Sequence, residues 1–546
     1  MKRFLHILLL TFFTISSVVA QNKAVKNVIL LIPDGTSLPV VSAARWYQRY
    51  NQPELTKLNI DPYLCGTILT YSSNAPIGDS APTTSCYMTG YPSRAGYIAM
   101  YPPADPLNDI IPMDTGRAYQ PMMTVLEAAR ITQNKATGLV FTCEFPHATP
   151  ADCAAHTYNR SKYEWIVPQM VHNKLDVVIG GGASLLTEDE QQFLKNEGYG
   201  VFLNSIDSLR NYKGDRMWSL FGVTDMAYDI DRDPGKEPSL AEMTQKAIEK
   251  LSKNKNGFFL MVEGSKTDWA AHANDPAALI TDFLAFDKAC GVALDFAKAN
   301  GKTVVVIVPD HGNSGFSIGS NKCPSYTTLT KDQLFSSISK FKTSQDKLVA
   351  TIQDTDTAGL KDTFYRLTGI SLDDDAYAQL LQCTDYKRST LSNEGAAKGS
   401  LLAKVVAEIL DKNTCFGFTT HGHTGEEVFL AVYDPTRNRL TGNHTNIELN
   451  QYLRKTMGFK QSLESLTNDY FAKHTDVFAD YSYTLSANKG ETPVLTVRNN
   501  NKALEIRPNT NIVKLNGKEV ELNTVAVFVD KNNTFYLPRL LRELLK

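Results

Sequence analysis

The sequence lacks the features of several large protein classes. It has 56 Lys and Arg residues against 58 Asp and Glu residues, and no stripe of basic residues. Nucleic-acid-binding proteins normally carry such a stripe, so we expect no nucleic acid among the partners. No run after residue 20 is apolar enough to cross a bilayer, which excludes a membrane span. The chain has no internal repeat or low-complexity segment, and its 546 residues allow one large globular domain plus a small one.

Three familiar binding or catalytic motifs are also incomplete. Gly180–Gly182 lacks the G-x-G-x-x-G spacing of dinucleotide-binding loops. Asp229–Asp233 is similar to the start of a calcium-binding loop, but Pro234 replaces the glycine that such a loop requires. Gly90–Arg94 is similar to part of the sulfatase signature, yet a glycine at position 90 has no side chain to become the nucleophile. We therefore expect none of these three sites.

The N-terminus has the pattern of a secretory signal peptide. Lys2 and Arg3 precede a mostly apolar run, and the small residue Ala20 stands before Gln21. We expect residues 1–20 to be removed and the protein to be secreted, with the periplasm as its compartment. Eight cysteines in a secreted chain permit disulfides, whose pairing the sequence leaves open. Cys143 and Cys153 are close enough to pair but are equally compatible with buried thiols.

The rest of the chain predicts an α/β fold with a large, mostly parallel sheet. Short apolar runs that alternate with helical patterns are predicted as its strands: 26–32, 137–142, 176–179, 258–262, 303–308 and 428–433. We expect a catalytic domain over residues 21–475, with a polar, mostly helical insertion at about 316–418 that covers the site. From residue 476 to 546, short alternating strands and the turn Asn516-Gly517 predict a small α+β module.

Potential metal ligands follow several of the predicted strands. Open α/β sheets place their sites at the carboxyl ends of parallel strands. The candidate ligands there are Asp34, Thr149, Glu263, Asp268, His272, Asp310, His311 and His423. Asp268 and His272 are four residues apart, so they share one face of a helical turn, and this pair suits zinc. On spacing alone His421 is as good a candidate as His423.

Ser80 is the candidate nucleophile. Pro82 suits the first turn of a helix, which puts Ser80 at or next to the N-cap, where backbone N–H groups favour an anion. A simple capping role is the alternative for this segment taken alone. Arg160 lies four residues after His156 on a predicted helix, so the imidazole could support the guanidinium. A serine, an arginine and several metal ligands are what phosphoryl transfer needs.

At these residues the chain resembles the metal-dependent alkaline phosphatases, over roughly residues 27–472. The resemblance implies their three-layer sandwich fold and the hydrolysis of phosphate monoesters through a phosphoserine at Ser80, within the Asp-Ser-Ala segment. It implies two Zn²⁺, one Mg²⁺ and a phosphate-binding Arg160. The implied ligands are Asp34, Asp310 and His311 for one zinc, Asp268, His272 and His423 for the other, and Asp34, Thr149 and Glu263 for magnesium. It is also compatible with a homodimer.

Two positions depart from the best-known bacterial members of that family. These carry Asp where His147 stands and Lys where Trp269 stands, although other branches of the family carry His or Trp there. Both residues are expected beside the substrate and the third metal. Because an imidazole adds nitrogen next to that site, we expect it to accept Zn²⁺ as well. The C-terminal module resembles the N-terminal domain of copper amine oxidases but has no visible copper ligands.

Two rival functions stay open at this point. A related phosphodiesterase or sulfatase would lack the third site that Thr149 and Glu263 form. A binding protein with purely structural metals would use four protein ligands for each zinc. The proposed three-ligand zinc site leaves one position open, which favours an enzyme.

Overall fold

The computed structural model describes residues 25–323, 326–383, 401–486 and 492–546. The predicted signal peptide lies outside these residues. Among them, no helix is both long and apolar enough to pass through a membrane.

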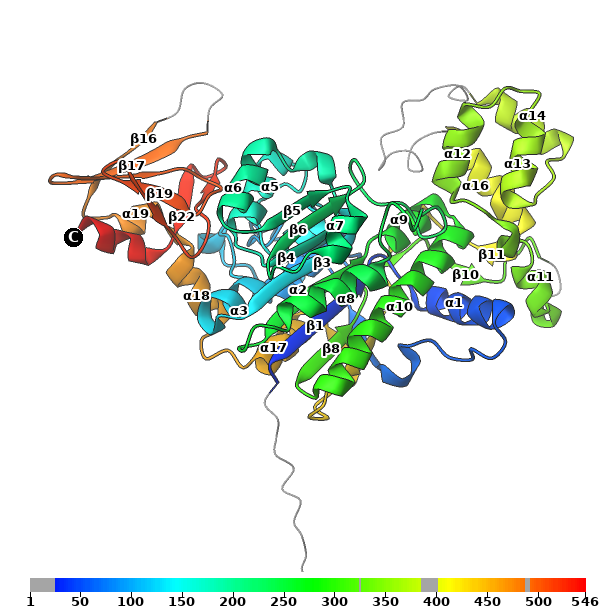
Figure 1. Cartoon of the computed structure of the whole chain (residues 1–546), viewed down its shortest axis with the longest axis horizontal. Helices are drawn as coiled ribbons and strands as arrows, with labels where there is room; N and C mark the ends of the chain where they lie inside the picture. The colour runs from blue at the N-terminus through cyan, green and yellow to red at the C-terminus, as the bar shows by residue number, and fades with distance from the viewer. Residues whose placement is uncertain (1–24, 324–325, 384–400, 487–491) are drawn as a thin grey trace, which may run out of the picture.

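A ten-stranded sheet forms the centre of the molecule, as the sequence predicts (Figure 1). In spatial order its strands are β14 (Gly442–Thr445), β2 (Leu64–Leu69), β13 (Val428–Tyr433), β8 (Thr303–Ile307), β1 (Asn27–Pro33), β7 (Phe258–Gly264), β3 (Ala136–Glu144), β4 (Val177–Gly181), β6 (Met217–Phe221) and β5 (Gly200–Leu203). Only β13 runs against its neighbours. The strands β1, β7 and β8 are completely buried because they consist of apolar, often β-branched residues. The carboxyl ends of these three strands therefore meet at one edge.

Helices cover both faces of the sheet, which gives three layers. On one face α8 (Leu240–Leu251) packs on β3 and β4, and α10 (Pro276–Asn300) packs on β7 and β8. On the other face α3 (Val125–Gln133) packs on β3, and α17 (Asn446–Met457) packs on β1 and on α2 (Ser80–Thr89).

The predicted insertion is helical. It contains α11 (Lys331–Phe335), α12 (Gln345–Gln353), α13 (Leu360–Thr368), α14 (Asp374–Gln382) and α16 (Leu401–Asn413). In Figure 1 it lies at the right, where α12 and α16 contact α9 (Lys266–Ala273). A disulfide between Cys323 and Cys415, which the sequence left undetermined, joins its two ends. Cys143 and Cys153 are both free thiols.

The C-terminal residues form a small strand-rich domain, drawn in orange and red in Figure 1. A five-stranded antiparallel sheet contains β16 (Ser482–Ser486), β17 (Val494–Asn499), β18 (Lys502–Ile506), β19 (Ile512–Leu515) and β20 (Lys518–Glu521). The Asn516-Gly517 turn joins β19 to β20 with both residues at positive φ, as predicted. Leu537 ends β22 (Thr534–Leu537), and a 3₁₀ helix, η6, spans Arg539–Leu545.

Candidate metal centre and active site

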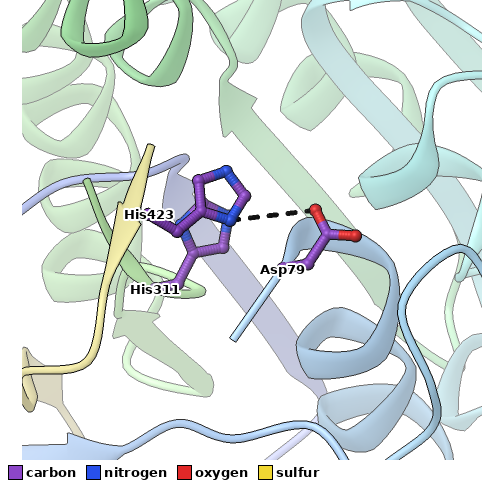
Figure 2. A group of neighbouring side chains, drawn as sticks. All are labelled: Asp79, His311 and His423. Carbon is purple, nitrogen blue, oxygen red and sulfur yellow. Dashed lines mark ion pairs between the residues drawn. The ribbon is translucent and has the colours of Figure 1, made fainter. Parts of the chain in front are cut away.

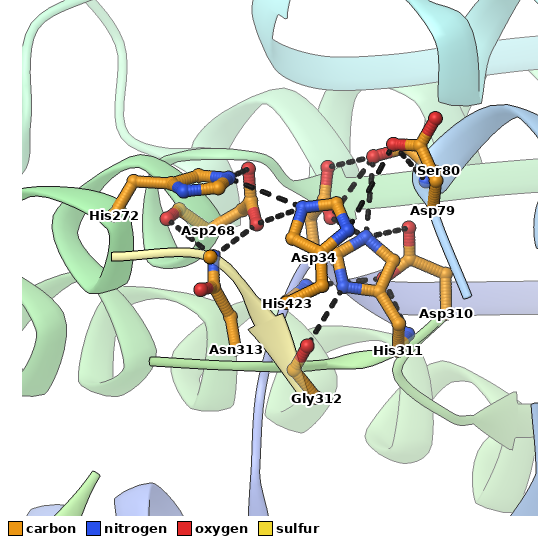
Figure 3. Close-up of polar contacts among 12 residues, drawn as sticks. Asp34, Asp79, Ser80, Asp268, His272, Asp310, His311, Gly312, Asn313 and His423 are labelled. Atoms are coloured by element: carbon orange, nitrogen blue, oxygen red, sulfur yellow. Dashed lines mark hydrogen bonds and ion pairs between the residues drawn. The ribbon is translucent and has the colours of Figure 1, made fainter. Parts of the chain in front are cut away.

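The fold brings the candidate ligands together at the carboxyl edge of the central sheet (Figure 3). Asp34 directly follows β1, and Glu263 lies near the end of β7. Asp310 and His311 follow β8, and α9 carries Asp268 and His272 on one face. His423 lies on the two-residue strand β12 (His423–Thr424), which pairs with β9 (Gly312–Asn313) and so sits next to His311.

Asp268, His272 and His423 form the first ligand group. The Nε2 atoms of the two imidazoles are 3.1 Å apart. Asp268 Oδ2 is 3.4 Å from Nε2 of His272, and Asp268 Oδ1 is 3.6 Å from Nε2 of His423. One nitrogen from each imidazole and one carboxylate oxygen therefore converge on a single point, as in a tetrahedral metal site with one open position.

The backbone fixes which imidazole nitrogens can bind a metal. Nδ1 of His272 lies 2.6 Å from the carbonyl oxygen of His421, and Nδ1 of His423 lies 3.0 Å from that of Gly78. A carbonyl only accepts hydrogen bonds, so both Nδ1 atoms carry the proton and both Nε2 atoms present lone pairs. Two lone pairs that face each other at 3.1 Å need a cation between them. This donor set therefore fits a divalent metal ion.

Asp34, Asp310 and His311 form the second ligand group, and Ser80 faces it. Nε2 of His311 is 3.4 Å from one carboxylate oxygen of each aspartate. Ser80 Oγ lies 3.3 Å from the same Nε2 and 3.4 Å from Asp34 Oδ2. All four side chains are buried. Nδ1 of His311 donates to the carbonyl oxygen of Gly312 at 3.1 Å, so its Nε2 also presents a lone pair.

The buried carboxyl groups at this edge of the sheet also favour a bound cation. Burial raises the pKa of Asp34 well above its usual range, and the carboxylates of Asp310 and Asp268 raise it further. Burial raises the pKa of Glu263 to about 7. Burial, together with the nearby His311, lowers the pKa of His423 to about 4, so this imidazole is neutral at pH 7. Buried carboxyl groups whose pKa values are raised by one another lack a compensating positive charge, and a bound metal ion would supply it.

Arg160 lies beside Ser80 and is held from two sides. Its NH1 donates to Asp79 Oδ1 at 3.1 Å, and its NH2 donates to His147 Nε2 at 2.9 Å. Asp79 is the N-cap of α2, since the same Oδ1 accepts from the backbone N–H of Ser80 at 2.9 Å. In Figure 2, Asp79 faces the stacked rings of His311 and His423, with Nδ1 of His423 3.9 Å from Asp79 Oδ1. Asp79 thus connects the backbone of Ser80 to the guanidinium of Arg160.

A third group lies between β3 and β7. Cys143, His147 and Glu263 each offer one possible ligand atom, and these atoms lie within 4.8 Å of one another. Thr149, on the short helix α4 (Ala148–Ala151), is fully buried nearby on the same segment. Trp269 packs edge-on against the His147 ring at 5.9 Å, and its own ring lies 3.8 Å from the ammonium of Lys266.

The structure also shows where His156 and His421 lie. His156 and Arg160 do not lie on a helix, because the chain after α4 turns and forms a bridge between Thr157 and Ile98. The His156 imidazole instead contacts Glu127 and the carbonyl oxygen of Ala99, each at 3.1 Å, so it has a structural role and does not support Arg160. His421 points its Nδ1 at the carbonyl oxygen of His272, outside the ligand group.

Sequence reasoning gave no role to three residues at this site. They are Asp79, Asn313, whose Nδ2 donates to Asp268 Oδ1 at 2.6 Å, and Cys143. Asp79 had a usable signal, because an Asp directly before a helix is a preferred N-cap. Asn313 and Cys143 had none, because their contacts come from segments distant in the sequence.

Comparisons with known proteins agree with this geometry. A family model described as alkaline phosphatase matches residues 25–459. Alkaline phosphatase 4 of Bacillus subtilis (strain 168) is 31% identical over 444 residues, which cover 78% of this chain and 88% of that protein. Alkaline phosphatase 3 of the same organism is 32% identical over 450 residues, which cover 80% and 89%.

Solved structures share the fold. The cold-active alkaline phosphatase of the psychrophile Shewanella sp. has a TM-score of 0.67 and 25% identity, covering 79% of this chain and 100% of that one. The Thermus thermophilus enzyme has a TM-score of 0.69 and 24% identity, covering 81% and 93%. A histidine variant of the TAB5 alkaline phosphatase, described with Mg bound in its M3 site, has a TM-score of 0.55 and 24% identity, covering 80% and 99%. The chain therefore belongs to the alkaline phosphatase family of metal-dependent phosphatases, which hydrolyse phosphate monoesters.

Proposed function

We propose that this enzyme transfers the phosphoryl group of a phosphate monoester first to Ser80 and then to water. The observation that carries the proposal is the position of the Ser80 hydroxyl. Its oxygen lies 3.3 Å from His311 Nε2 and 3.4 Å from Asp34 Oδ2, among the ligands of one metal group. A serine that only capped a helix would not need buried carboxylates and an imidazole around its hydroxyl.

The N-terminus of α2 prepares this serine for attack on phosphorus. Ser80 is the first residue of α2, so the positive end of the helix dipole faces the incoming phosphate. The metals, when bound, would favour the alkoxide of Ser80 and neutralise charge on the phosphoryl oxygens. The serine oxygen forms the new bond to phosphorus as the alcohol leaves, and water then releases inorganic phosphate.

Arg160 orients the phosphate. Guanidinium groups bind phosphate oxygens with fixed geometry only when their own rotation is restrained. Asp79 and His147 each accept a hydrogen bond from a different terminal nitrogen of Arg160 and so fix the orientation of its guanidinium plane. The role of His147 in this account is to position Arg160.

The donor sets support two zinc ions and a third divalent ion. Mixed imidazole and carboxylate ligands suit zinc at Asp268, His272 and His423. They suit it again at Asp34, Asp310 and His311, where His311 Nε2 is 3.4 Å from an oxygen of each aspartate. The third ion is assigned to Thr149 and Glu263 together with Asp34. From the family resemblance this ion would be magnesium.

Hydrolysis of three substrates tests the reaction class: an aryl phosphate, an aryl phosphodiester and an aryl sulfate. We expect the monoester to be cleaved at least a hundredfold faster than the other two. Ser80→Ala should lose most of that activity with its metal content unchanged. Ser85→Ala is the matched control, because Ser85 lies on the same helix but bonds to Asp152 at 2.6 Å. A phosphodiester or sulfate preference would contradict the proposal.

We also propose that the protein is secreted through residues 1–20 and acts in the periplasm, which the signal-peptide pattern supports. The C-terminal module, residues 476–546, is proposed to be a domain related to the N-terminal domain of copper amine oxidases. Its five-stranded antiparallel sheet is compatible with that relationship. N-terminal sequencing of the exported protein would test the cleavage after Ala20.

A further inference from the structure

The third metal group contains a thiol that the proposed function does not use. Cys143 lies near the carboxyl end of β3 and is fully buried. Its thiol donates a hydrogen bond to Glu263 Oε2 on the adjacent strand β7, with Sγ 3.5 Å from that oxygen. The backbone N–H of Cys143 donates to Ser265 Oγ at 3.0 Å, so the main chain here is held in place. Among the free cysteines of the described ranges, only Cys143 belongs to a group of possible metal ligands.

Two oxygen atoms beside this thiol have no hydrogen-bond partner among the described residues. Glu263 Oε1 and Thr149 Oγ1 are buried without a hydrogen bond to any residue that the structure describes. Both side chains are completely inaccessible to solvent. A buried carboxylate oxygen without a partner is costly, so this site needs a cation or a donor.

His147 does not supply the missing ligand in this geometry. Arginine nitrogens only donate hydrogen bonds, so the 2.9 Å contact from Arg160 NH2 uses the lone pair of His147 Nε2. A neutral imidazole has one such lone pair, and its Nδ1 then carries the proton. The remaining donor atoms that can face the metal are oxygens and the sulfur of Cys143.

We propose that the Cys143 thiolate is a ligand of the third metal site, and that this site takes zinc in preference to magnesium. The inference rests on the proposed function, because it assigns the identity of that function's third ion. Magnesium prefers oxygen ligands and water in octahedral geometry, whereas thiolate is a preferred ligand of zinc. When the metal binds, the thiol proton passes to solvent and the sulfur electron pair forms the bond to the metal.

Metal analysis of the full chain tests this proposal. Wild-type protein, equilibrated with equal concentrations of zinc and magnesium, should hold three zinc ions per chain. Cys143→Ser and Cys143→Ala should keep two, and their preference for zinc at the third site should fall by about tenfold or more. Cys290→Ala is the matched control, since Cys290 is equally buried but lies on α10 and belongs to no ligand group. It should keep all three zinc ions.

Cobalt substitution of the wild type gives a readout that needs no variant. A sulfur-to-cobalt charge-transfer band in the near ultraviolet is expected, and it should disappear in Cys143→Ser but persist in Cys290→Ala. Magnesium at the third site of the wild type, or a cobalt protein without that band, would overturn the inference while two zinc ions and monoester hydrolysis remain. Fewer than two bound metals without monoester hydrolysis would instead contradict the proposed function.

Discussion

At the scale of single residues, the decisive feature is the direction of lone pairs. Backbone carbonyls hold Nδ1 of His272, His311 and His423, so three Nε2 atoms turn toward Asp34 and Asp268. In His147 the arrangement is reversed: its Nε2 accepts a hydrogen bond from the guanidinium of Arg160, so this nitrogen does not face a metal group. We therefore expect histidine to serve as a metal ligand in three places and to position Arg160 in a fourth.

The first prediction concerns His272, His423 and His421. His272→Ala or His423→Ala should remove about one zinc per chain, because each change leaves two of the three ligands in that group. His421→Ala is the control and should keep the full metal content, since the His421 side chain points at the carbonyl oxygen of His272. Mass spectrometry of the metals would check this. Loss of zinc in His421→Ala with retention in His423→Ala would reverse the assignment.

A second prediction concerns the support of Arg160. His147→Ala removes the hydrogen-bond partner of Arg160 NH2, and a hydrogen bond to a charged group contributes about 1.5–3 kcal/mol. Inhibition by inorganic phosphate should therefore weaken by about tenfold or more, with the zinc content unchanged. His444→Ala, a partly exposed histidine beside Glu448, is the control. An unchanged inhibition constant would show that His147 does not position Arg160.

At the scale of elements, buried carboxyl groups attach the insertion to the catalytic domain. Asp346 on α12 accepts a hydrogen bond from the Tyr228 hydroxyl at 3.0 Å, while its Oδ1 is buried without a partner among the described residues. Asp231, which precedes α8, accepts hydrogen bonds from the hydroxyls of Thr343 and Ser344 at the start of α12. Burial raises the pKa of Asp346 to about 6. The attachment is therefore strongest while Asp346 is protonated.

The sign of the pH effect follows from linkage. The folded protein holds the Asp346 proton more tightly than the unfolded chain, so stability falls as the pH rises from about 4 to about 6. Asp346→Asn removes this loss. Its free energy of unfolding relative to wild type should improve by up to about 2–3 kcal/mol between pH 4 and pH 8. Urea unfolding at both values checks this, with the exposed Asp354→Asn at the end of α12 as control. A difference that does not vary with pH would contradict the prediction.

At the scale of the whole molecule, the C-terminal domain reaches the segment that carries Arg160. Asp530 is 3.5 Å from the ammonium of Lys162, and the ammonium of Lys531 lies 5.3 Å from the centre of the Tyr158 ring. A second contact joins Arg130 to the carbonyl oxygen of Asn523 at 2.6 Å. A domain outside the matched family region, residues 25–459, thus contacts the segment that carries Arg160, the residue proposed to bind phosphate.

Asp530→Ala should loosen this segment. A partly exposed ion pair contributes at most about 1 kcal/mol, so KM should rise by a factor of about two to five while kcat and metal content stay the same. Asp480→Ala is the control, because Asp480 pairs with Arg542 within the C-terminal domain and away from Lys162. Equal KM values in the two variants would show that the domain does not influence the phosphate site.

The sequence predicted what depends on local pattern and missed what depends on distant contacts. The strands β1, β7 and β8 are continuous apolar runs, so the strands and the acidic residues at their carboxyl ends could be recognised. Four strands of the sheet were not predicted: β2, β5, β6 and β14. The edge strands β5 and β14, and β2 next to β14, are only partly buried and have no such run. β6 is fully buried but short, and a serine interrupts its apolar residues. The pairing of Cys323 with Cys415, 92 residues apart, could not be deduced from spacing.

The phosphoserine at Ser80 is the central element of the proposed mechanism. The direct measurement is to mix the enzyme with an excess of aryl phosphate, quench the reaction in acid within its first turnovers, and locate phosphate in the digested peptides by mass spectrometry. We expect phosphate on the peptide that contains Ser80, and none in Ser80→Ala. Rapid hydrolysis of the monoester by Ser80→Ala, with its metals bound, would contradict the account.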